Sequence, residues 1–290
     1  MEKEFGKFKG ILIIGLGLIG GSITISLKNS GYRGKIYGFD LSAERVKKAI
    51  QLQAIDEGFT SLKEVPWENV DLVIIATPVK RFEEVAKKIK PYLKKGSVVT
   101  DVGSVKGDLV EKLQKILSPI KFVGAHPIAG TEKEGVENAV VGLFKGKKLI
   151  LTVDKEDKDT KRVEQFWRDL GSKVEVMDPY THDFVFASVS HLPHAVAFAL
   201  VDALIELSEE VGIDLFLYSG AGFKDFTRIA ASSPVVWKDI FLENKENVLY
   251  TIDRFIKSME KLKEFIEKED EKNLLKLLSE SREKRLSLDK

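Results

Sequence analysis

The residue in this chain with the clearest capacity for acid–base chemistry is His126. It opens the segment HPIAGTE, which Ala125 separates from an apolar segment, 121–124, that we expect to be a strand. At the carboxyl end of a parallel strand, the imidazole would be exposed to the groove where such sheets bind ligands. A neutral imidazole, whose unperturbed pKa is about 6.5, can accept a proton from a substrate hydroxyl while hydride leaves the same carbon. The alternative is a turn histidine that only hydrogen-bonds the backbone.

A second set of charged residues lies in the segment GFKDFTR, residues 222–228. Asp225 and Arg228 are three positions apart and share one face if this segment is helical. An arginine there could bind a substrate carboxylate through two parallel hydrogen bonds, with Asp225 or Glu132 holding the guanidinium in place. The alternative is a surface ion pair with no ligand.

The remaining histidines raise the question of a metal site. His191 and His194 would lie on one helix face, and His182 is near them in sequence. A zinc site is conceivable, but the chain has no cysteine and no obvious set of acidic ligands beside them. We therefore predict no metal.

A glycine motif predicts a dinucleotide site. The motif directly follows the apolar segment 10–14 and opens an amphipathic segment, the context in which GxGxxG binds a pyrophosphate at a helix N-terminus. In this pattern the first glycine permits a tight turn, the second lets the phosphates approach the backbone, and the third allows close packing of helix on strand. The alternative is a tight turn that binds nothing. The predicted contacts are Gly15, Leu16, Gly17, Leu18, Ile19 and Gly20.

The choice of cofactor depends on Asp40. It lies twenty residues beyond Gly20, at the end of the second predicted strand, where a carboxylate accepts hydrogen bonds from the adenosine ribose. A negative charge there repels a 2′-phosphate, which favours NAD over NADP. Nearby basic residues could still attract that phosphate; they are Arg45, Lys47 and Lys48.

Two further strand ends follow the rule that ligands bind beyond the carboxyl ends of parallel strands. Thr77 and Pro78 follow one predicted strand, and the segment from Asp101 to Ser104 follows the next. We expect both segments to line the nicotinamide half of the groove. Ordinary loops without a ligand are the alternative.

The pattern along the chain predicts how these residues are positioned. Up to residue 177, short apolar segments alternate with amphipathic ones, which is typical of a mostly parallel sheet covered by helices. The expected strands are 10–14, 35–39, 71–76, 97–101, 121–124, 148–153 and 173–177, and helices are expected at 42–53, 81–93 and 158–170.

After Asp178 the strand pattern disappears and long helical periodicity takes over. We predict an α/β Rossmann-type N-terminal domain, residues 1–177, followed by an all-α C-terminal domain, residues 178–290. Residues 251–288 are rich in Lys, Glu and Leu at helical spacing. They would form a bundle or a dimer seam.

Composition excludes several classes of function. The 290 residues include 46 basic and 45 acidic ones, interleaved along predicted helices, so we expect no nucleic-acid partner. Without cysteine, disulfides, thiolate metal sites and cysteine nucleophiles are excluded. The N-terminus lacks an apolar signal core, and we expect no segment with the roughly 18 apolar residues that span a bilayer. The predicted location is cytoplasmic.

Taken in order, the motifs resemble the prephenate dehydrogenase family. The resemblance runs from Gly10 to about Val248, and HPIAGTE followed by SHLPH and then TRIA is highly specific in that order. The motifs that carry it are GLGLIGGS (15–22), ATP (76–78), DVGSVK (101–106), HPIAGTEKEG (126–135), SHLPH (190–194) and GFKDFTRIAASSPVVW (222–237).

The resemblance implies an NAD-dependent oxidative decarboxylation of prephenate to 4-hydroxyphenylpyruvate, with release of CO2 and NADH, in tyrosine biosynthesis. By matching position, His126 resembles the family's proton acceptor and Ser104 the hydroxyl that supports it. Arg228 resembles the arginine that binds the substrate carboxylate. Other positions resemble substrate-pocket residues, namely Thr131, Glu132, His191, His194, Asp225 and Trp237.

The family also implies a helical C-terminal domain that forms a homodimer, with pocket residues that can cross between subunits. We expect no fused mutase or regulatory domain, so that inhibition by tyrosine would act at the active site itself. Arogenate remains an alternative substrate. Two different functions also remain open at this point: a hydroxyacid dehydrogenase with a lysine base, and an NAD-sensing regulator without turnover.

Overall fold

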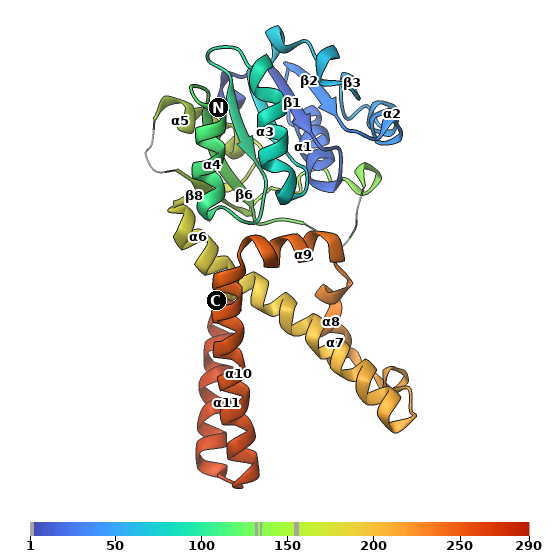
Figure 1. The fold of residues 1–290 in the computed structure, drawn as a ribbon, viewed down its shortest axis with the longest axis vertical. Coiled ribbons are helices and arrows are strands. Elements are labelled where there is room, and N and C mark those ends of the chain that lie inside the picture. The colour runs from blue at the N-terminus through green and yellow to red at the C-terminus, as the bar shows by residue number, and fades with distance from the viewer. Residues whose placement is uncertain (1–2, 131–132, 134, 154–156, 290) are drawn as a thin grey trace. The chain divides into compact units, whose positions relative to one another are not determined.

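The computed structural model describes residues 3–130, 133, 135–153 and 157–289. Contacts between residues divide it into two units, 1–244 and 245–290, and each is described by itself. The first unit contains the sheet and the helices α1 to α9, and the second contains α10 and α11 (Figure 1).

Within the described residues, the strands form one eight-stranded sheet in the order β3-β2-β1-β4-β5-β6-β7-β8. Pairing is parallel from β3 through β6, antiparallel between β6 and β7, and parallel again between β7 and β8. The strand order reverses between β1 and β4, which is where such sheets bind nucleotides. The strands are β1 Gly10–Ile14, β2 Lys35–Phe39, β3 Glu57–Phe59, β4 Leu72–Ile75, β5 Val98–Asp101, β6 Lys121–Pro127, β7 Lys148–Thr152 and β8 Lys173–Met177.

The structure corrects the predicted strands at two places. β3 is an additional short strand, which was missed because its three residues show no apolar alternation. β6 continues to Pro127 instead of ending at Gly124, because its second half pairs with the antiparallel strand β7. His126 therefore lies within the sixth strand, opposite Ile150, and not in the loop that follows a fifth strand.

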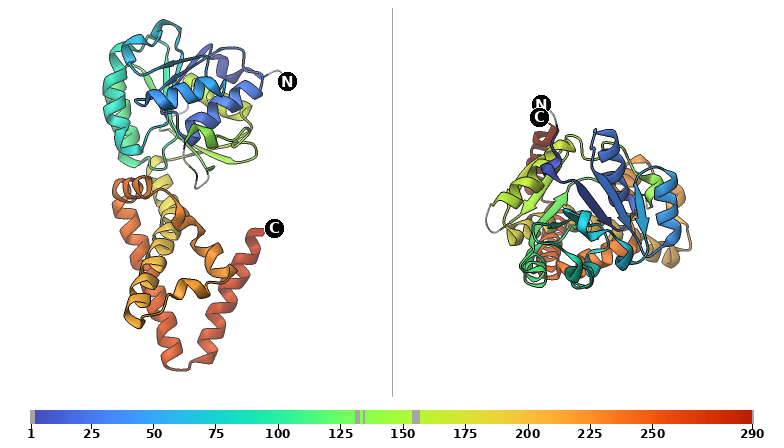
Figure 2. Two further views of the ribbon diagram at one scale, coloured as in Figure 1. Left: turned by 90° about the vertical axis from the view of Figure 1, so that its right-hand side faces the viewer. Right: turned by 90° about the horizontal axis from the view of Figure 1, so that it is seen from above.

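Helices cover both faces of the sheet (Figure 1, Figure 2). Alternate residues of β1 point to opposite faces, so Ile11 and Ile13 pack with α1, α2 and α5, whereas Leu12 and Ile14 pack with α3 and α4. The helices are α1 Leu18–Asn29, α2 Ala43–Gln51, α3 Phe82–Ile89, α4 Gly107–Leu117 and α5 Lys158–Asp169. Connecting 3-10 turns are Phe5–Lys7, Leu62–Glu64, Trp67–Asn69, Val79–Arg81, Lys90–Tyr92 and Val136–Asn138.

A long helical segment begins where the sheet ends. The Asp178 carboxylate accepts hydrogen bonds from the backbone N–H groups of Tyr180 and Thr181, and Pro179 occupies the first turn. The segment ends at Gly212, whose φ of 66° is the left-handed conformation that glycine tolerates. Its parts are α6 Pro179–Phe186, the π-helical turn Ala187–His191 and α7 Leu192–Val211. Beyond it lie Leu215–Tyr218, α8 Ala221–Thr227, Arg228–Ala231 and α9 Pro234–Glu243.

This segment corrects the expectation that no stretch is long and apolar enough to span a membrane. By length and composition alone, the helix Pro179–Val211 is long and apolar enough to cross a membrane. The expectation was based on unbroken apolar runs, whereas the average over a helix tolerates residues such as His191 and Ser190. A core helix of a soluble protein passes the same test, so this observation alone is weak evidence for a membrane.

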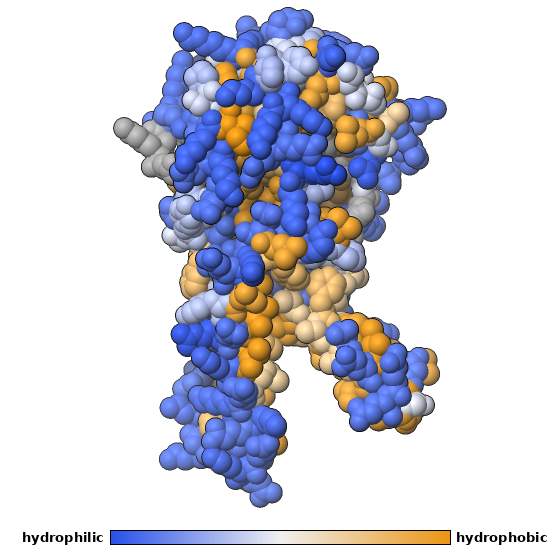
Figure 3. Space-filling model, viewed as in Figure 1, coloured by the Kyte–Doolittle hydropathy of each residue, from blue (hydrophilic) through white to orange (hydrophobic). Residues whose placement is uncertain are grey.

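Apolar side chains are exposed along the end of α7 and the turn after it, and Figure 3 shows hydrophilic and hydrophobic side chains mixed over this end of the helix. Half or more of Val211 and Ile213 is exposed, and about four-fifths of Leu217 and Tyr218. Where exposed apolar side chains adjoin one another, they mark a surface that another molecule covers.

The second unit is a helical hairpin of α10 Lys245–Glu267 and α11 Glu271–Leu286. The Asp270 side chain begins α11 by accepting a hydrogen bond from the backbone of Asn273. This agrees with the helical periodicity of residues 251–288. The contacts divide the chain after Asn244, within the helical part, and the domain boundary near residue 178 stays a prediction.

Candidate active site

The glycine turn sits at the carboxyl end of β1, at the point where the strand order reverses. Gly15 has a φ of 102°, and a Cβ there would lie 2.6 Å from the Ala76 carbonyl oxygen. A Cβ on Gly20 would lie 2.1 Å from the Gly15 carbonyl oxygen, whereas a Cβ on Gly17 would meet nothing within 4 Å. Gly15 and Gly20 are thus required by the fold, and Gly17 leaves open space at the N-terminus of α1. This arrangement fits the pyrophosphate of a dinucleotide.

Asp40 lies against the glycine turn. Its two carboxylate oxygens accept hydrogen bonds from the backbone N–H groups of Leu16 and Ser42, both at 2.9 Å, and Arg45 lies 3.7 Å away. The side chains of Leu16 and Leu18 are buried, so only their backbone can face a ligand, and Ile19 is half-buried. Asp40 therefore holds the turn in place, and its role toward the ribose stays a prediction.

The ends of β4 and β5 lie at the same edge of the sheet. Ala76 and Thr77 pack directly against Gly15, Thr77 is half-buried, and Pro78 is exposed. Thr77 donates a long hydrogen bond of 3.4 Å to the Pro78 carbonyl oxygen. Of the two predicted cofactor residues, Thr77 therefore borders the glycine turn.

The loop after β5 is held by a buried ion pair that the sequence analysis did not identify. The ammonium group of Lys106 lies 2.5 Å from Asp101, and each side chain is 1 % exposed. Asp101 also accepts hydrogen bonds from the backbone N–H groups of Gly103 and Ala125. Both carboxylate oxygens of Asp101 are engaged in these contacts. Its side chain therefore holds the loop in place, and Ser104 in that loop is half-buried.

His126, which we predicted to be an exposed base, is buried. Only 9 % of the residue is exposed, because the helix α6 covers β6 and brings Phe186 to 4.8 Å between ring centroids. Burial, reinforced by the neighbouring His182 and the Lys106 cation, holds the pKa of His126 well below its usual 6.5. The imidazole is therefore neutral at physiological pH, as a proton acceptor must be.

A chain of hydrogen bonds connects His126 to His182 and Asp183. Its Nδ1 lies 2.8 Å from Nε2 of His182, and Nδ1 of His182 lies 2.8 Å from Oδ1 of Asp183. The same oxygen accepts a hydrogen bond from the Lys106 backbone N–H at 2.7 Å. Burial lowers the pKa of His182, although Asp183 opposes that shift. Three segments of the chain, at β6, α6 and the start of α4, thus converge behind one imidazole.

The histidines of the SHLPH motif continue this cluster. His191 is 1 % exposed, burial lowers its pKa to about 3, and its Nδ1 lies 3.2 Å from the Asn244 side-chain nitrogen. His194 stacks on Trp237 with 3.5 Å between ring centroids. Burial lowers the pKa of His194, and the nearby Arg228 cation contributes in the same direction. The structure thus brings together four of the predicted pocket residues, namely His191, His194, Arg228 and Trp237.

The predicted carboxylate clamp is only partly helical. α8 ends at Thr227, so Asp225 lies on that helix while Arg228 begins the next 3-10 turn, and both residues are exposed. Thr131 and Glu132 lie outside the described residues. Among the described residues, no group of three or more His, Cys, Asp or Glu side chains is placed to hold a metal.

The residues that the sequence did not indicate are those of the hydrogen-bonded network that holds His126. Lys106 was part of a quoted motif but received no role, and His182 was considered only as a zinc ligand. Asp183 and Asn244 were not considered. The available signal was the pair His182-Asp183 within the otherwise apolar segment PYTHDFVF, because such polar groups need partners when they are buried.

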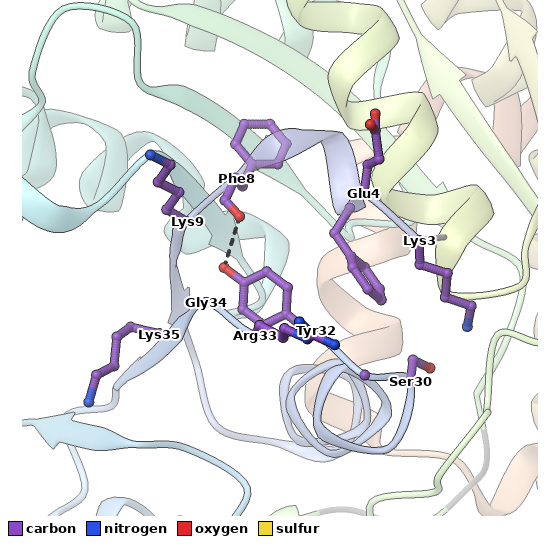
Figure 4. A pocket seen from close by; sticks show the side chains of 11 residues that line it. Lys3, Glu4, Phe8, Lys9, Ser30, Tyr32, Arg33, Gly34 and Lys35 are labelled. Atoms are coloured by element: carbon purple, nitrogen blue, oxygen red, sulfur yellow. Dashed lines mark hydrogen bonds between the residues drawn. The ribbon is translucent and has the colours of Figure 1, made fainter. Parts of the chain in front are cut away.

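A separate cavity of about 630 Å³ lies at the opposite edge of the sheet, where β1 and β2 begin (Figure 4). Tyr32 lies in it and donates a hydrogen bond to the Phe8 carbonyl oxygen. Basic side chains line it, among them Lys9, Arg33 and Lys35. None of the predicted site residues lines this cavity.

A dinucleotide turn and a buried neutral imidazole at one edge of a doubly covered sheet define the class of nucleotide-dependent dehydrogenases. Comparison with known proteins narrows the class. Residues 23–176 match the nucleotide-binding domain of prephenate dehydrogenase, and residues 178–280 match its dimerization domain. The chain belongs to the prephenate dehydrogenase family.

Individual relatives agree with this assignment. The crystal structure of prephenate dehydrogenase from Aquifex aeolicus, in complex with hydroxyphenyl propionate and NAD+, is 52% identical with a TM-score of 0.92, covering 97% of this chain and 98% of that one. Prephenate dehydrogenase of Bacillus subtilis is 36% identical over 95% of this chain and 75% of the relative. Cyclohexadienyl dehydrogenase of Zymomonas mobilis is 34% identical over 97% of this chain and 96% of the relative.

Proposed function

We propose that this protein is an NAD-dependent prephenate dehydrogenase, which forms 4-hydroxyphenylpyruvate, CO2 and NADH on the route to tyrosine. The observation that carries the proposal is the buried, neutral His126 at the same sheet edge as the glycine turn. The substrate class is supported by the relative that was crystallised with hydroxyphenyl propionate and NAD+.

The protein groups have distinct tasks in this reaction. The glycine turn and Asp40 would hold NAD, which would supply the acceptor for the hydride on the ring carbon that bears the hydroxyl. His126 takes the hydroxyl proton, the bond to the ring carboxylate breaks, and its electron pair completes the aromatic ring as CO2 leaves. The overall reaction releases no proton, so the proton held by His126 returns to the phenol oxygen. A buried imidazole suits this task because water cannot easily remove the proton.

Recognition of the substrate requires cationic and hydrogen-bonding groups. We expect Arg228 to bind a carboxylate of prephenate through its planar guanidinium. It lies near His194, which is itself stacked on Trp237. Ser104, in the loop held by Lys106 and Asp101, would hydrogen-bond the ring hydroxyl beside His126. Thr131, Glu132 and Asp225 remain proposed pocket residues.

We further propose a homodimer formed through the helical part of the chain. The match of residues 178–280 to a dimerization domain supports it, as does the exposed apolar surface at the end of α7. A second copy would cover that surface. This explains the apolar helix Pro179–Val211 without a membrane, and a cytoplasmic location follows from it as an expectation.

One assay tests the function. Purified protein is mixed with NAD or NADP and with prephenate or arogenate, and NADH or NADPH formation is followed by absorbance. We expect NAD and prephenate to give the highest kcat/KM. Activity with arogenate as well would place the protein with the cyclohexadienyl dehydrogenase of Zymomonas mobilis. Failure with both substrates, despite NAD binding, would leave the regulator hypothesis.

A further inference from the structure

His126 can accept a proton from a substrate only at a ring nitrogen that carries no hydrogen. A neutral imidazole has one protonated and one bare nitrogen, and the hydrogen-bond partner of one nitrogen determines which is which. The partner of Nδ1 of His126 is another histidine, His182, so the protonation of the base depends on the protonation of a second imidazole.

The carboxylate of Asp183 resolves this dependence. A carboxylate only accepts hydrogen bonds, so Nδ1 of His182 must be the donor across their 2.8 Å contact. Nε2 of the neutral His182 is then bare, and it accepts the hydrogen that Nδ1 of His126 must carry. This leaves Nε2 of His126 without hydrogen. The chain Asp183–His182–His126 therefore has one consistent arrangement of protons while both rings are neutral.

The surroundings keep this chain in place. Asp183 Oδ1 also accepts the Lys106 backbone N–H, and the Asp183 backbone oxygen accepts a hydrogen bond from the Asn244 side chain at 2.8 Å. His182 is fully buried, so water does not compete for its nitrogens. Phe186 packs against both imidazoles, with ring centroids 4.8 Å from His126 and 4.5 Å from His182.

We propose that His182, oriented by Asp183, is a positioning residue that fixes the tautomer of His126 with the bare nitrogen at Nε2. The inference rests on the proposed function, because it assigns a purpose to the bare nitrogen. His182 also offers a bare nitrogen to the hydrogen on Nδ1 of His126 when His126 becomes an imidazolium, so the transient charge is not left without a partner in a buried site.

The tautomers can be observed directly. The chain contains only four histidines, so nitrogen-15 NMR of histidine-labelled protein with NAD bound would show four imidazoles, each assignable with a single His→Gln variant. We expect His126 and His182 each to carry hydrogen on Nδ1 and none on Nε2. Hydrogen on Nε2 of His126 in the unmodified protein would overturn the proposal, and this result requires no variant.

Variants of His182 test the consequence for the rate. His182→Phe removes the acceptor, and kcat should fall by about 10- to 100-fold, as loss of a group that orients a catalytic imidazole does, with little change in the KM for prephenate. His182→Gln restores an acceptor near the former Nε2 and should recover most of the rate. Unchanged kcat and tautomer in His182→Phe would contradict the proposal.

Phe186→Leu is the matched control, because it loosens the packing around both imidazoles without removing a hydrogen-bonding group. The tautomer of His126 should be unchanged in this variant, whatever the rate. A tautomer change in Phe186→Leu equal to that in His182→Phe would show that packing, not the hydrogen bond, is responsible. If the unmodified protein does not oxidise prephenate, the proposed function fails while the NMR result still decides the tautomer.

Discussion

The cofactor groove and the histidine cluster lie at one edge of the same sheet but are built differently. The groove is built from backbone: Gly15, Gly17 and Gly20 lie within one short segment, and Gly15 and Gly20 are needed because a Cβ there would collide with main-chain oxygens. The cluster is built from side chains that four separate segments contribute, from His126 on β6 to Asn244 at the end of α9.

This difference determines how each region responds to substitution. In the groove, a single added methyl group changes the shape of the backbone turn. The effect depends on whether the methyl group fills space that the fold needs or space that a ligand occupies. In the cluster, substitutions change which atoms carry hydrogen, and the fold can survive while the chemistry fails. Substitutions in the two regions should therefore separate binding, stability and rate.

The largest effect is expected for His126→Asn. The Asn amide nitrogen can occupy nearly the place of Nδ1 and donate to His182, so the hydrogen-bonded chain is kept while the base is lost. General-base catalysis contributes about 10²- to 10⁴-fold, and kcat should fall by that factor with the KM for prephenate within a few-fold. Steady-state kinetics measures both constants. Full activity in this variant would remove His126 from the mechanism.

A smaller effect, on a different constant, is expected for Arg228→Ala. Loss of a charge-assisted hydrogen bond costs about 1.5–3 kcal/mol, so the KM for prephenate should rise about 10- to 100-fold. Arg228→Lys keeps the charge but not the planar fork and should be intermediate. If the KM stays constant in Arg228→Ala, the arginine does not bind the substrate carboxylate.

The groove could be predicted from the sequence almost residue by residue, because its determinants are local. The glycine spacing, the preceding apolar segment and Asp40 all lie within the first 40 residues, and the structure places them together. The extension of β6 to Pro127 could not be predicted in this way, since it depends on pairing with β7, more than 20 residues later.

The histidine cluster was only half predictable for the same reason. His126, His191, His194 and Trp237 were identified through motifs, but no pattern in the sequence connects His126 with a residue 56 positions away. Burial of His126 was also missed, because it results from the packing of α6 on β6. Local patterns indicate which residues carry chemistry, and tertiary contacts decide their protonation.

A matched pair of glycine variants should separate a ligand effect from a fold effect. Gly17→Ala places its Cβ in open space, so Tm should change little, while the KM for NAD rises about tenfold if the methyl group occupies phosphate space, a cost of about 1.4 kcal/mol. Gly20→Ala places its Cβ 2.1 Å from the Gly15 oxygen, and stability should fall by about 1–3 kcal/mol. Thermal unfolding and NAD titration distinguish them. Equal losses of stability would show that Gly17 also belongs to the fold.

The smallest effect is the pH dependence of stability that the buried histidines impose. The folded-state pKa of His191 is lowered to about 3 and that of His126 is lowered as well, so the unfolded chain, with pKa values near 6.5, binds more protons in acid. Stability is therefore fully present above about pH 6.5 and declines toward the folded-state pKa, by up to about 1.4 kcal/mol per pH unit for each such histidine.

Urea unfolding between pH 7.5 and 5 measures this decline. His191→Gln should make the curve shallower, because one of the groups that gain a proton on unfolding is removed. The slope of unfolding free energy against pH should then fall by about 1.4 kcal/mol per unit near pH 5. The same slope in both proteins would mean that His191 gains its proton before the chain unfolds, and so is less buried than its 1 % exposure indicates.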